Sequence, residues 1–317
     1  MSVIAAPEMT AEVETDRRPG RVQTRVLTLG IASAVLLILI LLAIFAPLVA
    51  HYNPDTPVTT ALTPPTAQHW FGSDELGRDV LSRVIWGGRI PFLVSAVSVL
   101  IATAVGVTLG LIGGYTAGLV GGFIMRCMDV LLAFPALILG FAVIAIIGIG
   151  PTSMIIAISV AFVPVFARIA YTSTLSIKRE DFVTIARGLG LPASRILIRH
   201  VLRNLASEIA VVASSSFGWA LLLEAALEFL GMGTRPPTPD WGADLSAASD
   251  YVASGSWWVM FGPGVAITLA ILCSNLIGDD LAHLLGARSS RVSLGRLLRA
   301  LTGANRRSAS QEAAADA

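Results

Sequence analysis

Two glutamates stand four residues apart inside an apolar run that is otherwise free of charge, and they have the clearest chemical potential in this sequence. Glu224 and Glu228 lie in the segment 209–230, and their spacing places both on one face of a helix. Acidic side chains at membrane depth usually face a bundle interior or an aqueous path. We therefore consider both as candidates for an outer gate or pathway. The alternatives are an ion pair with an arginine of the segment 78–89, or side chains that extend to the membrane surface.

A second unusual feature is a basic stretch between two apolar runs. Residues 178–203 carry six Lys/Arg in two parts, separated by the turn-forming sequence 188–192. The first part has the i, i+3, i+4, i+7 apolar spacing of a short amphipathic helix, formed by Phe182, Ile185, Ala186 and Leu189. Inserting six basic residues into a bilayer would cost well over roughly 10 kcal/mol. We expect a cytoplasmic loop that docks on a soluble partner, and a loop that only satisfies the positive-inside rule is the alternative.

The residues of common catalytic and metal sites are absent or scattered. The sequence contains neither a G-x-x-x-x-G-K-[ST] phosphate-binding motif nor an H-E-x-x-H zinc motif. The four histidines are far apart and the two cysteines lack metal-ligand spacing. A net charge of +1 provides no global case for a nucleic-acid partner. We expect no catalytic residue, no metal site and no cofactor in this chain.

The composition is typical of a membrane protein. Of the 317 residues, 55% are hydrophobic and only 14% are charged, whereas soluble domains carry about 25% charged residues. Five long apolar regions predict an all-α membrane protein. Glycine-containing breaks at about 113–122 and 148–151 divide these regions into six transmembrane helices. The expected spans are about 26–50, 91–113, 122–148, 151–176, 205–231 and 257–285.

The distribution of Lys and Arg predicts the orientation of these spans. An even number of spans places both termini on one side, and most basic residues fall in the tails, the loop 177–204 and a glycine-rich turn. The positive-inside rule therefore predicts cytoplasmic termini. The expected organisation is an N-terminal tail (1–25), a permeation domain (26–286) and a flexible C-terminal tail (287–317). Residues 74–90 form an expected interfacial helix outside.

Several segments resemble the permease subunits of bacterial ABC importers. The family's cytoplasmic signature is Glu-Ala-Ala, three residues, Gly, nine residues, Ile, one residue, Leu-Pro. This chain matches it at Ala186, Gly190 and Leu202, while Thr184 stands where the signature has its glutamate. Segments 71–89, 224–242 and 275–281 are similar to the dipeptide/oligopeptide/nickel permeases. The resemblance covers about residues 26–290 and favours the shorter, "C"-type subunit of the two permeases.

The resemblance implies a fold, a location and a set of partners. The fold would be that of a type I ABC importer permease, in the bacterial cytoplasmic (inner) membrane. The partners would be a second homologous permease, one or two cytoplasmic ATPase subunits that bind ATP and magnesium, and an extracytoplasmic substrate-binding protein. The residues implied in coupling to the ATPase are Asp181, Ala186, Arg187, Gly188 and Gly190.

The expected function is thus ATP-driven import in which this chain provides the path and binds no nucleotide. Among the family's cargoes we expect dipeptides or oligopeptides. A permease for nickel or another small solute is the first alternative, and a stand-alone secondary transporter is the second. The second alternative calls for ion-coupling charges at mid-depth and often for inverted repeats, and no repeat is found in this sequence.

Overall fold

The regular secondary structure of the described residues is helical. The computed structural model describes residues 19–116 and 118–284. The C-terminal tail 287–317 and most of the N-terminal tail 1–25 therefore lie outside the described residues. Within them, five segments are long and apolar enough to cross a membrane, and a sixth is added if one bent pair of helices counts as a single span.

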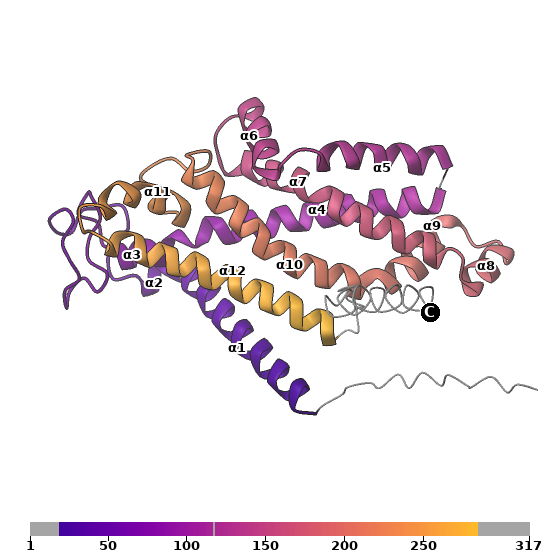
Figure 1. Cartoon of the computed structure of the whole chain (residues 1–317), viewed down its shortest axis with the longest axis horizontal. Coiled ribbons are helices and arrows are strands. Elements are labelled where there is room, and N and C mark those ends of the chain that lie inside the picture. Colours follow the sequence, from indigo (N-terminus) through magenta and orange to yellow (C-terminus); the bar gives the residue numbers. More distant parts are fainter. Residues whose placement is uncertain (1–18, 117, 285–317) are drawn as a thin grey trace, which may run out of the picture.

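Five long helices account for about half of the described residues. They are α1 (Pro19–Ile44), α4 (Arg89–Thr116), α7 (Pro151–Ile177), α10 (Leu202–Phe229) and α12 (Trp258–Leu284). Each has 26 to 28 residues, which exceeds the 20 or so needed to span a bilayer. Figure 1 shows them side by side in an elongated bundle.

The expected continuous span at 122–148 is instead a bent pair of helices. Helix α5 (Gly118–Leu132) and helix α6 (Ala136–Ile147) meet at an angle of 95°. The break falls at Pro135, which precedes the first residue of α6 as its N-cap. Proline lacks the N–H of a helical residue and disfavours helical backbone in the residue before it. This segment therefore forms either a broken span or a re-entrant loop.

Short elements gather at the two ends of the bundle. Helices α2 (Ala46–Val49), α3 (Val80–Gly87) and α11 (Trp241–Val252) lie at one end, beside the irregular segment 50–79. Helices α8 (Asp181–Gly188) and α9 (Ala193–Ile196) lie at the other (Figure 1). The expected helix at 74–90 is shorter at its start, because Gly77 has φ +76° and Asp79 caps α3 by accepting from the Ser82 N–H at 2.8 Å.

A ladder of glycines allows α4 and α7 to pack closely. Gly106, Gly110 and Gly114 lie on one face of α4 at four-residue spacing, as in the small-residue interfaces of membrane helices. A Cβ at Gly106 would lie 2.6 Å from the Val163 carbonyl oxygen, and one at Gly110 would collide with the Ala167 carbonyl oxygen. The close approach of the two backbones therefore requires glycine.

Adding one methyl group in this ladder is expected to destabilise the bundle. Gly110→Ala should lower the free energy of unfolding by about 1–3 kcal/mol, because the added Cβ forces two packed backbones apart. The matched control is Gly122→Ala, since a Cβ at Gly122 meets nothing within 4 Å. Thermal unfolding of the two variants in detergent checks the difference, and equal melting temperatures would contradict the packing argument.

Candidate coupling helix and buried carboxylate cluster

Helix α8 presents apolar side chains to both the bundle and the solvent. Val183 and Ala186 face the core and are 1% and 8% exposed, whereas Ile185 and Leu189 are 62% and 75% exposed. Of the apolar stripe expected from the sequence (Phe182, Ile185, Ala186 and Leu189), only Ala186 is buried. Phe182 is 42% exposed and stacks at a tilt against His200, with ring centroids 6.1 Å apart. The outward face of α8 therefore carries unpartnered apolar surface.

The turn after α8 is fixed by Gly190. Its φ of +78° is in the left-handed region that glycine adopts without strain. The Leu191 N–H donates to the Ala186 carbonyl at 3.2 Å, which is the six-to-one hydrogen bond of a Schellman helix end. Pro192 then serves as the N-cap of α9. Ala186 and Gly190, which both match the family signature, therefore determine how α8 ends and how the chain turns back toward the bundle.

The segment after this turn runs directly into a membrane-spanning helix. Helix α9, the π-helical turn η1 (Leu197–Val201) and α10 follow one another without a gap. On the other side, α8 is separated from α7 by only three residues, 178–180. Lys178 anchors this junction because its Nζ donates to the Tyr115 carbonyl at the end of α4, 2.5 Å away. Helix α8 is thus connected by short segments to α7 on one side and to α10 on the other.

The structure places the five coupling candidates within or just after α8. Asp181 is its first residue and is exposed, Ala186 is buried, and Gly188 is its last residue. Arg187 lies in the helix, and its side chain is outside the described part. Gly190 follows in the turn, where a Cβ would meet nothing within 4 Å. Their expected role in coupling stays a prediction.

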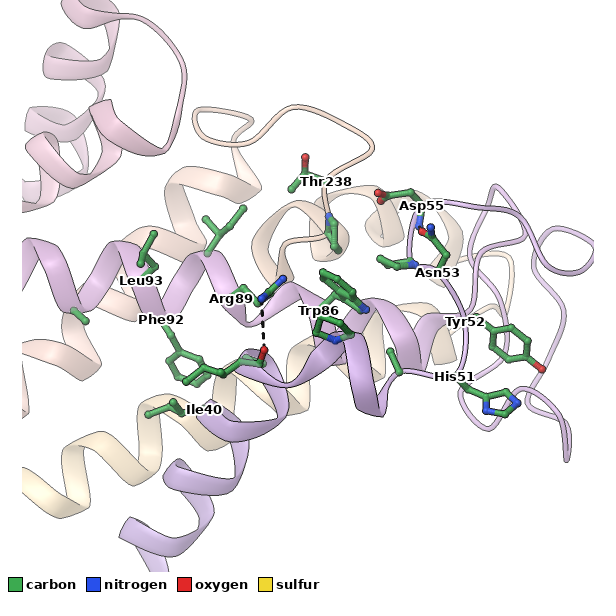
Figure 2. A pocket seen from close by; sticks show the side chains of 18 of the residues that line it. Ile40, His51, Tyr52, Asn53, Asp55, Trp86, Arg89, Phe92, Leu93 and Thr238 are labelled. Carbon is green, nitrogen blue, oxygen red and sulfur yellow. Dashed lines mark hydrogen bonds between the residues drawn. The ribbon is translucent and has the colours of Figure 1, made fainter.

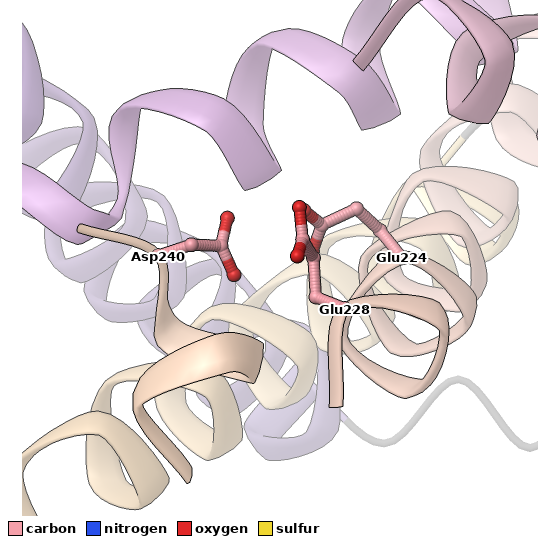
Figure 3. A group of neighbouring side chains, drawn as sticks. All are labelled: Glu224, Glu228 and Asp240. Atoms are coloured by element: carbon pink, nitrogen blue, oxygen red, sulfur yellow. The ribbon is translucent and has the colours of Figure 1, made fainter. Parts of the chain in front are cut away.

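At the opposite end of the bundle, three carboxylates converge in the interior. Glu224 and Glu228 are 0% and 1% exposed on α10, and Asp240, which precedes α11, is 0% exposed. One oxygen of each lies within 4.8 Å of the others. Figure 3 shows the three side chains pointing toward one another from α10 and from the start of α11. Asp240 had no assigned role in the sequence, although an Asp before a Trp-Gly helix start is an N-cap signal.

Hydrogen bonds satisfy only part of this cluster. Glu228 accepts from the N–H and the hydroxyl of Thr234, at 2.7 and 3.3 Å. Asp240 accepts from the Gly242 N–H at 2.8 Å. Both oxygens of Glu224 and Oδ2 of Asp240 meet no N–H group or hydroxyl among the described residues. Burial, followed by the nearby Glu228 charge, raises the pKa of Asp240 well above its usual range.

The arginines named as alternative partners of these glutamates are engaged elsewhere. Arg78 binds Asp74 at 2.6 Å and Glu75 at 3.1 Å. Arg83 binds Asp244 at 2.5 Å. Arg89 lies over the Trp86 ring and donates to the Ile44 carbonyl at 3.5 Å. None of the three arginines pairs with Glu224 or Glu228, so the ion-pair alternative is wrong within the described residues. The expected gate or pathway role of the two glutamates stays a prediction.

Arg83 connects three segments that are distant in the sequence. Besides Asp244 on α11, it donates to the carbonyls of Pro54 at 3.0 Å and Pro237 at 3.2 Å. Burial raises the pKa of Asp244, and the Arg83 guanidinium opposes that rise. The Trp241 indole N–H donates to the Val84 carbonyl at 2.8 Å. These contacts fasten α3, α11 and the segment 50–79 into one unit.

An open cavity of about 1010 Å³ lies at the same end as this unit. It is lined by the end of α1, the start of α4 and residues 50–55 and 238–239 (Figure 2). Arg89 borders the cavity and lies over the Trp86 ring at 4.8 Å. The ends of α1 and α4 that line it lie at the opposite end of the bundle from α8 (Figure 1).

Comparison with known proteins identifies the family. Residues 106–291, more than half of the chain, match the family described as binding-protein-dependent transport system inner membrane component. The chain belongs to this family. The expected resemblance is thereby confirmed, as is the location in the inner membrane. The permease is a translocation component rather than an enzyme, and its family works with a binding protein.

Curated relatives extend the match over most of the permease. The dipeptide transport system permease protein DppC of Alkalihalophilus pseudofirmus is 39% identical, over 76% of this chain and 80% of its own length. The di/tripeptide transport system permease protein DppC of Pseudomonas aeruginosa is 40% identical, with 78% and 83% covered. The glutathione transport system permease protein GsiD of Salmonella typhimurium is 42% identical, with 79% and 83% covered.

Proposed function

We propose that this permease forms half of the membrane path of an ABC importer for dipeptides and other short peptides. The relatives named for dipeptide, di/tripeptide and glutathione transport support this substrate class, since all three cargoes are small peptides. A second homologous permease completes the path. One or two cytoplasmic ATPases bind ATP and magnesium, and an extracytoplasmic binding protein delivers the peptide.

The observation that carries the proposal is the exposed apolar face of α8. Ile185 on α8 and Leu189 directly after it are more than half exposed at the end of the bundle. Helix α8 is connected to α7 by residues 178–180, and to α10 by a turn, α9 and η1. Exposed apolar clusters on a rigid element are typical of protein docking sites. The ATPase is the partner we assign to this face, so α8 acts as the coupling helix that transmits ATP-driven motion to α7 and α10.

The proposed orientation places α8 in the cytoplasm together with both chain termini. The Thr28 hydroxyl near the start of α1 donates to Asp280 near the end of α12, at 2.7 Å. The first part of α1 and the end of α12 therefore lie next to each other, on the side of the molecule away from α2, α3 and α11 (Figure 1). The bent α5–α6 pair counts as one of six spans in this arrangement, which is the one expected for a type I permease.

Reconstitution of the whole transporter tests the proposal. We expect proteoliposomes that contain this permease, its sister permease, the ATPases and the binding protein to accumulate a radiolabelled dipeptide only when ATP is present. Radiolabelled glutathione and nickel in parallel samples separate the substrate alternatives. ATP-dependent uptake of nickel without any uptake of peptide would overturn the assigned substrate. Uptake by the lone chain without ATP would support a secondary transporter instead.

A further inference from the structure

The buried carboxylate cluster has more negative groups than its surroundings can offset. Glu224, Glu228 and Asp240 bring six carboxylate oxygens into one fully enclosed place. No arginine, lysine or histidine forms an ion pair with any of the three among the described residues. The positive groups that face the cluster are backbone N–H groups, from Thr234 and from Gly242 at the start of α11. These dipoles compensate only part of the charge.

The unpartnered atoms point to a missing ligand. Both oxygens of Glu224 lack a hydrogen-bond donor although the side chain is 0% exposed. Oδ2 of Asp240 also lacks one, while its Oδ1 is used to cap α11. Buried polar atoms in native proteins are nearly always satisfied by protein, water or an ion. Figure 3 shows the carboxyl groups of the three side chains turned toward one another.

The backbone around the cluster is shaped to enclose it. A Cβ at Gly233 would collide with Oε1 of Glu228 and with the Met154 sulfur. A Cβ at Gly242 would lie 2.6 Å from the Glu228 Cβ. Glycine at both positions therefore lets the segment between α10 and α11 close over the carboxylates. A site enclosed in this way holds its oxygens in place before any ligand arrives.

We propose that Glu224, Glu228 and Asp240 form a binding site for a divalent cation, with Ca²⁺ as the ion that fits best. Hard cations take oxygen ligands such as carboxylates, and Ca²⁺ accepts six to eight oxygen ligands in flexible geometry. Mg²⁺ demands near-octahedral geometry and keeps several waters. A bound divalent ion connects α10 to the start of α11. Its role is therefore to stabilise the end of the bundle opposite α8.

The test uses the assembled transporter, purified without chelator. We expect metal analysis to find a stoichiometric Ca²⁺, which EDTA treatment removes with a fall in melting temperature that Ca²⁺ restores better than Mg²⁺. Tb³⁺ is a second probe, because Trp241 follows Asp240 directly and is 3% exposed, so its excitation sensitises emission from an ion bound in the cluster.

Neutral variants of similar shape assign the ion to the three carboxylates. Glu224→Gln and Asp240→Asn should each weaken Ca²⁺ and Tb³⁺ binding by about tenfold or more, and asparagine retains the helix cap. Glu208→Gln and Asp250→Asn are matched controls, since both residues are exposed on the same helices, α10 and α11, and should leave binding unchanged.

Two results would overturn the proposal. The first is a wild-type transporter that holds no Ca²⁺, gives no Trp-sensitised Tb³⁺ emission and melts at one temperature with EDTA and with Ca²⁺. Protons would then neutralise the carboxyls. The second is ion binding that both variants retain, which would place the ion elsewhere. If Glu224→Gln fails to assemble, the wild-type measurements and Asp240→Asn still decide the matter.

Discussion

Replacing Ile185 and Leu189 together with glutamate is expected to abolish peptide uptake while the permease remains in the membrane. Ile185 on α8 is 62% exposed and Leu189, directly after α8, is 75% exposed, so the variant leaves the core unchanged. Apolar anchors of an interface contribute about 2 kcal/mol or more each. Loss of two such anchors lowers affinity for the ATPase by roughly several-hundred-fold. The measurements are ATP-dependent uptake in proteoliposomes and the amount of ATPase that co-purifies.

The matched control for this experiment is Thr184→Glu. Thr184 is exposed on the same helix and stands where the family signature has its glutamate. The substitution adds a charge to α8 without removing an apolar side chain, so uptake should persist. Normal uptake by the Ile185/Leu189 variant, or equal loss in the control, would show that the exposed apolar face is not what the ATPase binds.

The second large effect is expected from Arg83→Met. Arg83 is 5% exposed and holds Asp244 at 2.5 Å, together with two backbone carbonyls. Removing one partner of a buried ion pair costs about 3–5 kcal/mol, because the other charge stays buried without compensation. The carboxylate left without its partner is that of Asp244. Burial already raises the pKa of this carboxyl group. The melting temperature of the purified permease should fall well below that of the wild type.

Two further variants separate the ion pair from general effects of charge removal. Arg235→Met removes an exposed arginine from the same end of the bundle and should leave the melting temperature nearly unchanged. Combining Arg83→Met with Asp244→Asn should recover part of the lost stability, since the uncompensated carboxylate is then gone. If the double variant lost as much stability as the Arg83→Met and Asp244→Asn single variants lose together, this account would be contradicted.

The sequence could predict the long helices because their signal is simple. A run of about 20 apolar residues is sufficient to indicate a span, and α7 and α12 lie within a residue or two of the expected positions. The bend between α5 and α6 was missed since Pro135 lies in an apolar run that hydropathy alone treats as continuous. The four-residue spacing of Gly106, Gly110 and Gly114 was available as a packing signal but was not recognised.

The candidate sites, too, could be predicted only in part from the sequence. The apolar spacing on α8 was readable, but which members face the solvent depends on how α8 packs against the bundle, and only Ala186 of the expected stripe is buried. Glu224 and Glu228 were identified from their charge in an apolar run. Asp240 could not be joined to them from spacing, because it reaches the cluster through a loop whose course depends on tertiary contacts.

The most direct test of the central claim is a cross-link between α8 and the ATPase. The permease would carry Leu189→Cys in a chain whose exposed native Cys127 is replaced by serine, and the new thiol would bear a photoreactive group. The account predicts a covalent adduct with the ATPase subunit, and none from Trp70→Cys, which is exposed at the other end of the bundle. No adduct from position 189, or labelling of that thiol by an impermeant reagent outside intact cells, would contradict it.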